Sequence, residues 1–126
     1  MLSQCTYWHA NHGDQQVHLG LAAFGSEPAG LVARLASGRV ANIAAAAARD
    51  GEAGAFATPK TLIEAGDEAL DRLRRLIERL SAEDAATPGA GGLVADADAF
   101  RFLPPIPDAG KFLCVGKNYR AHLDEL

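Results

Sequence analysis

Three prolines in four positions, Pro104-Pro105-Ile106-Pro107, divide this chain of 126 residues into two unequal parts. Proline fixes φ and has no backbone N–H, so this stretch favours an extended, semi-rigid linker over the interior of a helix or sheet. We therefore predict a small domain over residues 1–103 and a linker over residues 104–110. Residues 111–126 are expected to be the truncated start of a second domain.

Hydrophobic alternation before residue 44 predicts a small antiparallel β-meander. The expected strands lie at residues 4–8, 17–24, 31–36 and 39–43. Asparagine and glycine tolerate positive φ, so Asn11 and Gly13 predict a turn over residues 9–14. Ser37 and Gly38 predict a two-residue hairpin turn between the last two strands.

A helix over residues 67–80 is predicted because large aliphatic residues recur on one face of it: Leu70, Leu73, Ile77 and Leu80. We expect this stripe to pack on the meander, and binding of a partner helix is the alternative. A shorter helix is expected at residues 44–49, and another begins with Thr58 as N-cap and Pro59 at the first helical position. Pro88 and neighbouring glycines predict an exposed loop over residues 81–92, and residues 100–103 a last strand. The expected fold class is α+β, a small antiparallel β-meander packed by helices.

The net charge and the number of cysteines indicate which binding partners and which cellular compartment to expect. The net charge of −4 gives no electrostatic attraction to nucleic acid or to an anionic membrane, so neither is expected as a partner. No apolar run approaches the roughly twenty residues that span a bilayer, and no signal peptide is evident. Two cysteines, Cys5 and Cys114, do not form a disulfide framework. We therefore expect a cytoplasmic protein with reduced thiols.

A dense polar cluster follows the short apolar run at residues 112–115. A strand that delivers polar side chains at its end is a common way to build a site. If the chain turns into a helix after Asn118, His122 and Glu125 lie three residues apart on one face and touch. The carboxylate would then orient the imidazole and raise its basicity, as a general base near neutral pH requires. The alternative is a solvated ion pair on an exposed turn.

Other motifs give little support for chemistry. His9, His12 and His18 fit no standard metal-ligand spacing. The chain has no nucleotide-binding glycine loop and no G-x-S-x-G nucleophile motif. Cys114 lies inside the apolar run, which favours a structural role over a nucleophilic one.

The segment from residue 102 onward resembles the entry into the catalytic domain of the fumarylacetoacetate hydrolase (FAH) family. Members carry a Gly-x-Asn-Tyr-x-x-His signature after a proline-rich linker and an apolar strand, and here it is Gly116, Asn118, Tyr119 and His122. Members that act on acylpyruvates also have a glutamate three residues after the histidine, where Glu125 stands. The segment differs from the family pattern at Ala121, where aspartate is frequent, and at Lys117, where leucine or arginine is usual.

The resemblance implies that residues 111–126 begin a mixed β-roll catalytic domain with a strand and a helix. It implies metal-dependent hydrolysis or cleavage of C–C bonds in acylpyruvate, β-diketo or 2-oxo acids. His122 would be the general base and Glu125 its orienting carboxylate, with Lys117, Asn118 and Tyr119 lining the substrate site. Mg²⁺ is the implied cofactor, with its ligands downstream of Leu126 and none within these residues. A small oxo-acid substrate and a homodimer are also implied. The alternative is a non-catalytic accessory or assembly module that packs on a catalytic domain.

Overall fold

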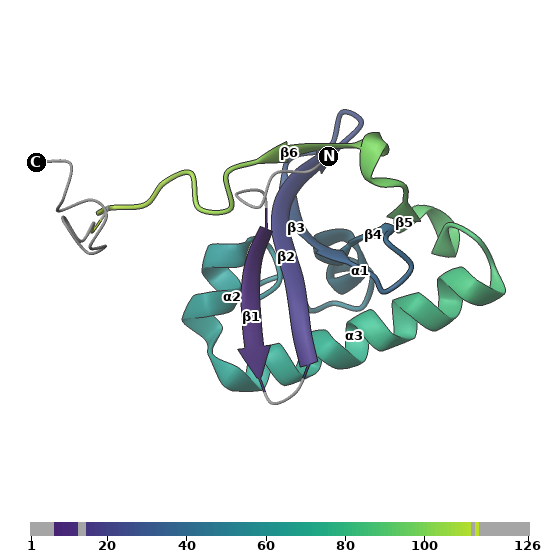
Figure 1. Ribbon diagram of the computed structural model, residues 1–126, viewed down its shortest axis with the longest axis horizontal. Helices are drawn as coiled ribbons and strands as arrows, with labels where there is room; N and C mark the ends of the chain where they lie inside the picture. Colours follow the sequence, from purple (N-terminus) through teal and green to yellow (C-terminus); the bar gives the residue numbers. More distant parts are fainter. Residues whose placement is uncertain (1–6, 13–14, 112, 114–126) are drawn as a thin grey trace, which may run out of the picture.

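The computed structural model describes residues 7–12, 15–111 and 113, and its architecture is α+β (Figure 1). The strands are β1 (Tyr7–His12), β2 (Gln15–Phe24), β3 (Gly30–Arg34), β4 (Val40–Asn42), β5 (Val94–Ala95) and β6 (Phe100–Leu103). The α-helices are α1 (Ile43–Arg49), α2 (Pro59–Ala65) and α3 (Asp67–Ala86). Two 3-10 turns, η2 (Ala90–Gly92) and η3 (Ala97–Ala99), flank β5. The prediction of an α+β fold with a meander packed by helices is therefore confirmed.

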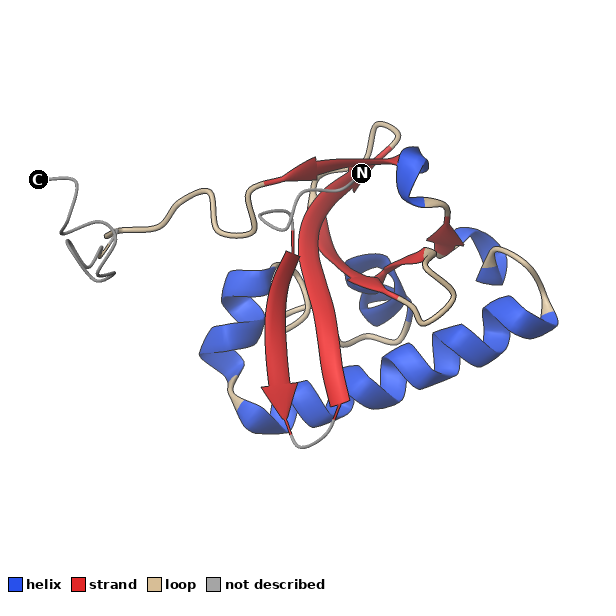
Figure 2. Cartoon of the chain, viewed as in Figure 1, coloured by secondary structure: helices blue, strands red, loops and turns tan. Residues whose placement is uncertain are grey.

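All described strand pairs are antiparallel, and β2 pairs with three other strands, β1, β3 and β6. Five strands follow in the order β1-β2-β3-β4-β5, and β6 also pairs with β2. β1 and β6 share one edge of β2 end to end, since Tyr7 lies opposite Gly20 and Leu103 lies opposite Leu21. β2 curves along its length, and β6 crosses the end of the sheet that lies away from α3 (Figure 2).

A hydrophobic core packs against each face of this sheet. On the helix side, Leu19 and Leu31 pack with Ile43 of α1 and with Leu73 and Leu80 of α3. The opposite face forms a second core from the following side chains: Ala22, Val32, Val40 and Phe100, with Phe24 and Phe102 against them. The Phe24 and Phe100 ring centroids are 5.1 Å apart. The predicted apolar stripe of α3 is therefore core, and β6 with η3 supplies the cover that a meander alone lacks.

The predicted start of α2 is confirmed, and the predicted β3–β4 hairpin is confirmed except for the length of its loop. The Thr58 hydroxyl accepts the Thr61 N–H at 3.2 Å and the Thr61 hydroxyl accepts the Thr58 N–H at 3.0 Å, a reciprocal cap with Pro59 at the first helical position. β3 and β4 form the predicted hairpin. Its loop has three residues rather than two, because the Leu35 carbonyl accepts the Gly38 N–H and the Leu35 N–H donates to the Arg39 carbonyl. Gly38 has φ +86°, the left-handed conformation that such a loop requires.

Two of the boundary predictions are wrong. Residues 9–12 belong to β1 and not to a turn, because their backbone pairs with β2 from His9 opposite His18 to His12 opposite Gln15. The other residues of the expected first strand and turn, 4–6 and 13–14, lie outside the described residues. Residues 81–86 belong to α3 and not to a loop. Alanine, the best helix former, fills three of these six positions, and the helix-breaking Pro88 comes only after them.

Candidate functional site

The site residues predicted from the sequence, Lys117, Asn118, Tyr119, His122 and Glu125, lie outside the described residues. Cys114 and most of the expected second-domain strand lie there as well. The pairing of His122 with Glu125 therefore stays a prediction. What the structure does describe is the domain that precedes these residues and the path of the linker toward them.

The linker lies against α2. Lys60, in the first turn of α2, places its Nζ 2.9 Å from Oδ2 of Asp108. Pro105 and Pro107 line a cavity of about 460 Å³ together with Leu21 and Thr61. The hydrogen bond to Asp108 raises the pKa of Lys60, and the same bond lowers the pKa of Asp108. Both groups are exposed, so water and salt weaken this ion pair.

Leu113 follows the linker in the sequence, in the part of the chain where a strand is predicted. Its side chain is 92% exposed, although it belongs to an apolar run of strand composition. Single exposed aliphatic residues are common on protein surfaces. An apolar run is a different case, because a strand of this composition is normally buried on both faces. The described domain provides no cover for this side chain.

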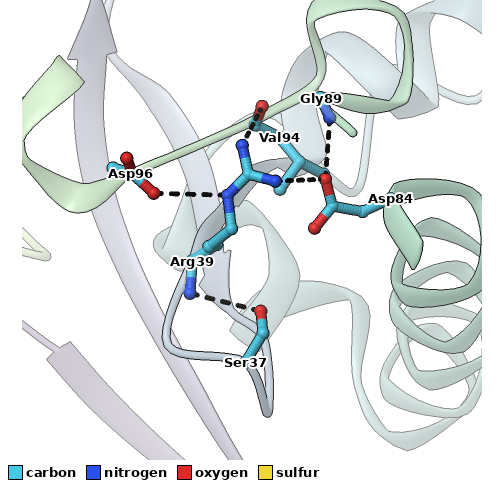
Figure 3. Close-up of polar contacts among 6 residues, drawn as sticks. All are labelled: Ser37, Arg39, Asp84, Gly89, Val94 and Asp96. Carbon is cyan, nitrogen blue, oxygen red and sulfur yellow. Dashed lines mark hydrogen bonds and ion pairs between the residues drawn. The ribbon is translucent and has the colours of Figure 1, made fainter. Parts of the chain in front are cut away.

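Arg39 forms a polar cluster that the sequence analysis missed (Figure 3). Its Nη1 lies 2.5 Å from Oδ1 of Asp84, a carboxylate only 9% exposed, and that same oxygen accepts the Gly89 N–H at 2.8 Å. The guanidinium also lies 3.3 Å from Asp96 and 3.4 Å from the Val94 carbonyl oxygen. Charge pairing and hydrogen bonding together satisfy the buried carboxylate, as burial demands. The cluster ties the β3–β4 hairpin to the end of α3 and to β5, and its role is structural.

A second group of ion pairs joins the end of α1 to α3. Arg79 contacts both Asp50 and Glu83, and Arg49 contacts the same two acids. The hydrogen bond from Arg79 lowers the pKa of Asp50. Nearby, the Arg72 guanidinium lies 5.5 Å from the centroid of the buried Phe56 ring. These contacts hold α1 and the following loop on α3.

Mg²⁺ needs several oxygen ligands that converge on one point. Among residues 7–12, 15–111 and 113, no three His, Cys, Asp or Glu side chains lie close enough together to hold a metal ion. Asp108, the acid nearest the predicted motif in the described chain, is bonded to Lys60. The resemblance places the magnesium ligands downstream of Leu126, outside the described residues. None of the described helices has the length and apolar character needed to cross a membrane.

Comparisons of this chain with protein-family models, with curated proteins and with solved structures found no match.

Proposed function

We propose that residues 1–103 are the accessory N-terminal domain of an enzyme resembling the FAH family, and that residues 111–126 begin its catalytic domain. The proposed reaction is hydrolysis or cleavage of a C–C bond in an acylpyruvate, β-diketo or 2-oxo acid. One observation carries the proposal: the spacing of Gly116, Asn118, Tyr119 and His122 after a proline-rich linker and a short apolar run. The homodimer and the cytoplasmic location are parts of the same proposal.

The described domain supports an accessory role. Both of its cores are closed by its own chain, and its buried carboxylate is bonded internally. The described part of the domain therefore packs its own hydrophobic interior. The contact between Lys60 and Asp108 holds the linker against α2. It thereby favours one path for the segment that follows the linker. The exposed side chain of Leu113 is consistent with the proposal that a catalytic domain packs over the apolar run.

In the proposed reaction, His122 takes a proton from water and the resulting hydroxide adds to a substrate carbonyl carbon. The C–C bond then breaks, its electron pair leaves as an enolate, and a proton returns to that enolate. Glu125 accepts a hydrogen bond from the other imidazole nitrogen and keeps the ring in the basic tautomer. Lys117, Asn118 and Tyr119 orient the substrate.

The test is turnover of an acylpyruvate by a chain that continues through a complete catalytic domain. Glu125→Gln keeps the size of the side chain and removes its charge, so kcat should fall while the protein stays folded. Glu64→Gln is the matched control, because Glu64 lies exposed on α2 and the proposal gives it no role. An equal loss in both variants, or none in Glu125→Gln, would contradict the proposed role of Glu125.

The second candidate is an assembly module with no chemistry of its own, favoured by the closed cores and the anchored linker. The two candidates differ in what deletion of residues 1–103 does. For an assembly module, deletion should abolish association of subunits, and substitution of His122 should leave the function of the assembly unchanged. For the enzyme, substitution of His122 should abolish turnover without altering the subunit count.

A further inference from the structure

A groove of about 680 Å³ lies between the β3–β4 turn, the beginning of β2 and the middle of α3. Its apolar lining includes Val17, Leu35 and Ile77 from these three elements. Val17 and Ile77 are only partly buried by the core, so part of their surface faces the groove. The volume falls within the range of small-molecule sites, about 300–1,000 Å³.

Positive charge borders this apolar surface. Arg34 at the end of β3 and Arg74 of α3 both line the groove. Arg34 is exposed, and no hydrogen bond or ion pair among the described residues uses its guanidinium. Arg74 is mostly enclosed, with 19% of its side chain exposed, and lies 3.8 Å from Asp71. The N–H groups of the Arg34 guanidinium are therefore available to donate hydrogen bonds to a ligand in the groove.

These features select one ligand chemistry. A guanidinium presents paired donors that match both oxygens of a carboxylate. The apolar wall favours a ligand that also buries a hydrocarbon body. Glu78 lines the groove as well, and its charge opposes a ligand with several negative charges. The net charge of −4 on the chain also disfavours general accumulation of anions.

We propose that this groove binds a small monocarboxylate with an apolar tail, with Arg34 holding the carboxylate and Val17 and Ile77 contacting the tail. None of the residues that line the groove belongs to the predicted motif around His122, so this proposal does not depend on the proposed function. Its ligand could be a metabolite or the free carboxylate of a peptide terminus with an apolar last side chain. Both share the same recognition chemistry.

The test is a nuclear magnetic resonance titration of residues 1–126 with butyrate, hexanoate and hexylammonium. We expect hexanoate to shift the amides of Leu35, Gly38 and Ile77, and to bind about tenfold more tightly than butyrate because it buries two more methylene groups. Hexylammonium has the same tail and the opposite charge, so it should bind much more weakly than hexanoate, and it should not respond to loss of the Arg34 charge. A peptide ending in leucine serves as a separate arm, and tighter binding of that peptide than of hexanoate would identify a protein terminus as the source.

Arg34→Gln should weaken hexanoate binding by about tenfold or more, the usual effect of losing a charge-assisted hydrogen bond. Arg101→Gln is the matched control, since Arg101 is also an exposed arginine on a strand and lies outside the groove lining. Arg34→Lys keeps the charge without the paired donors and should give an intermediate affinity. Equal binding of hexanoate by Arg34→Gln and the unsubstituted chain would overturn the proposal. Equal binding of hexylammonium, or the absence of any shift with millimolar hexanoate, would overturn it as well.

Discussion

Arg39 and Asp84 lie 45 residues apart in the sequence, and their side chains meet at 2.5 Å where the β3–β4 hairpin reaches the end of α3 (Figure 3). Asp84 is the buried charged residue of the described chain, and the same oxygen that contacts Arg39 also accepts the Gly89 N–H. The carboxylate thus fixes the hairpin and the loop after α3 at once. A buried polar contact whose hydrogen bonds are satisfied helps to fix the relative positions of the elements that it joins.

Replacement of Asp84 by alanine is expected to destabilise the domain by about 1–3 kcal/mol, because it leaves a backbone N–H and part of a guanidinium without their acceptor. Urea denaturation followed by circular dichroism measures the change. Asp96→Ala is the matched control: this partner of Arg39 is 82% exposed, and its loss should cost less than about 1 kcal/mol. Equal costs in the two variants would show that burial of Asp84 contributes nothing.

Leu73→Ala should cost about 2–5 kcal/mol, because Leu73 is fully buried between α3 and the sheet and its truncation leaves a cavity. Ile63→Ala, on the exposed side of α2, should cost much less, since Ile63 is already 43% exposed. The midpoint of chemical denaturation reports both. An unchanged midpoint for Leu73→Ala would mean that the stripe of α3 does not carry the core.

Docking of the linker on α2 should depend on pH and salt. Asp108 has a lowered pKa, so the contact is complete above the ordinary aspartate range and is lost as pH falls through that lowered value. Lys60 has a raised pKa, so the contact is also lost as pH rises through that raised value. The amide shifts of Thr61 and Asp108 should follow both transitions, and added salt should mimic them. Shifts that ignore salt and Asp108→Asn would contradict linker docking through this pair.

A chain of residues 1–126 is expected to bind Mg²⁺ no more tightly than millimolar and to leave an acylpyruvate unhydrolysed. The physical reason is that its described residues present no group of three ligands, and Asp108 is engaged by Lys60. Calorimetry with MgCl₂ and a spectroscopic assay of the substrate test the two expectations. Turnover that disappears on addition of a chelator would place a complete site within these residues.

Local signals predicted the parts of this fold whose determinants are neighbours in sequence. The start of α2 follows from Thr58 as N-cap with Pro59 at the first helical position, and the structure adds the hydroxyl of Thr61, which accepts the Thr58 N–H. The alternation along β2 follows from the period of an extended strand, and Val17 and Leu19, two residues apart, both pack into the core on the helix side.

The wrong prediction for residues 9–12 and the contacts that the sequence analysis missed have a different cause, which is long-range pairing. Residues 9–12 have the composition of a turn, yet the ladder with β2 makes them a strand. The last turns of α3 carry Asp84, whose partner Arg39 belongs to a distant hairpin, so no local pattern identified that contact. The groove beside Arg34 was missed for the same reason, because its walls come from three separate elements. The predicted catalytic residues lie outside the described part of the chain, and their assignment rests on their spacing in the sequence.

The most direct measurement of the central claim is the pH dependence of kcat for an acylpyruvate, in a chain that includes a complete catalytic domain, with and without His122→Ala. The account predicts that kcat of the unsubstituted enzyme rises with pH through one histidine-like ionisation, because the neutral ring is the base. It predicts that His122→Ala lowers kcat by roughly 10²–10⁴-fold and removes that dependence, with the denaturation midpoint unchanged. Unchanged turnover in His122→Ala, with the same pH profile, would contradict the account.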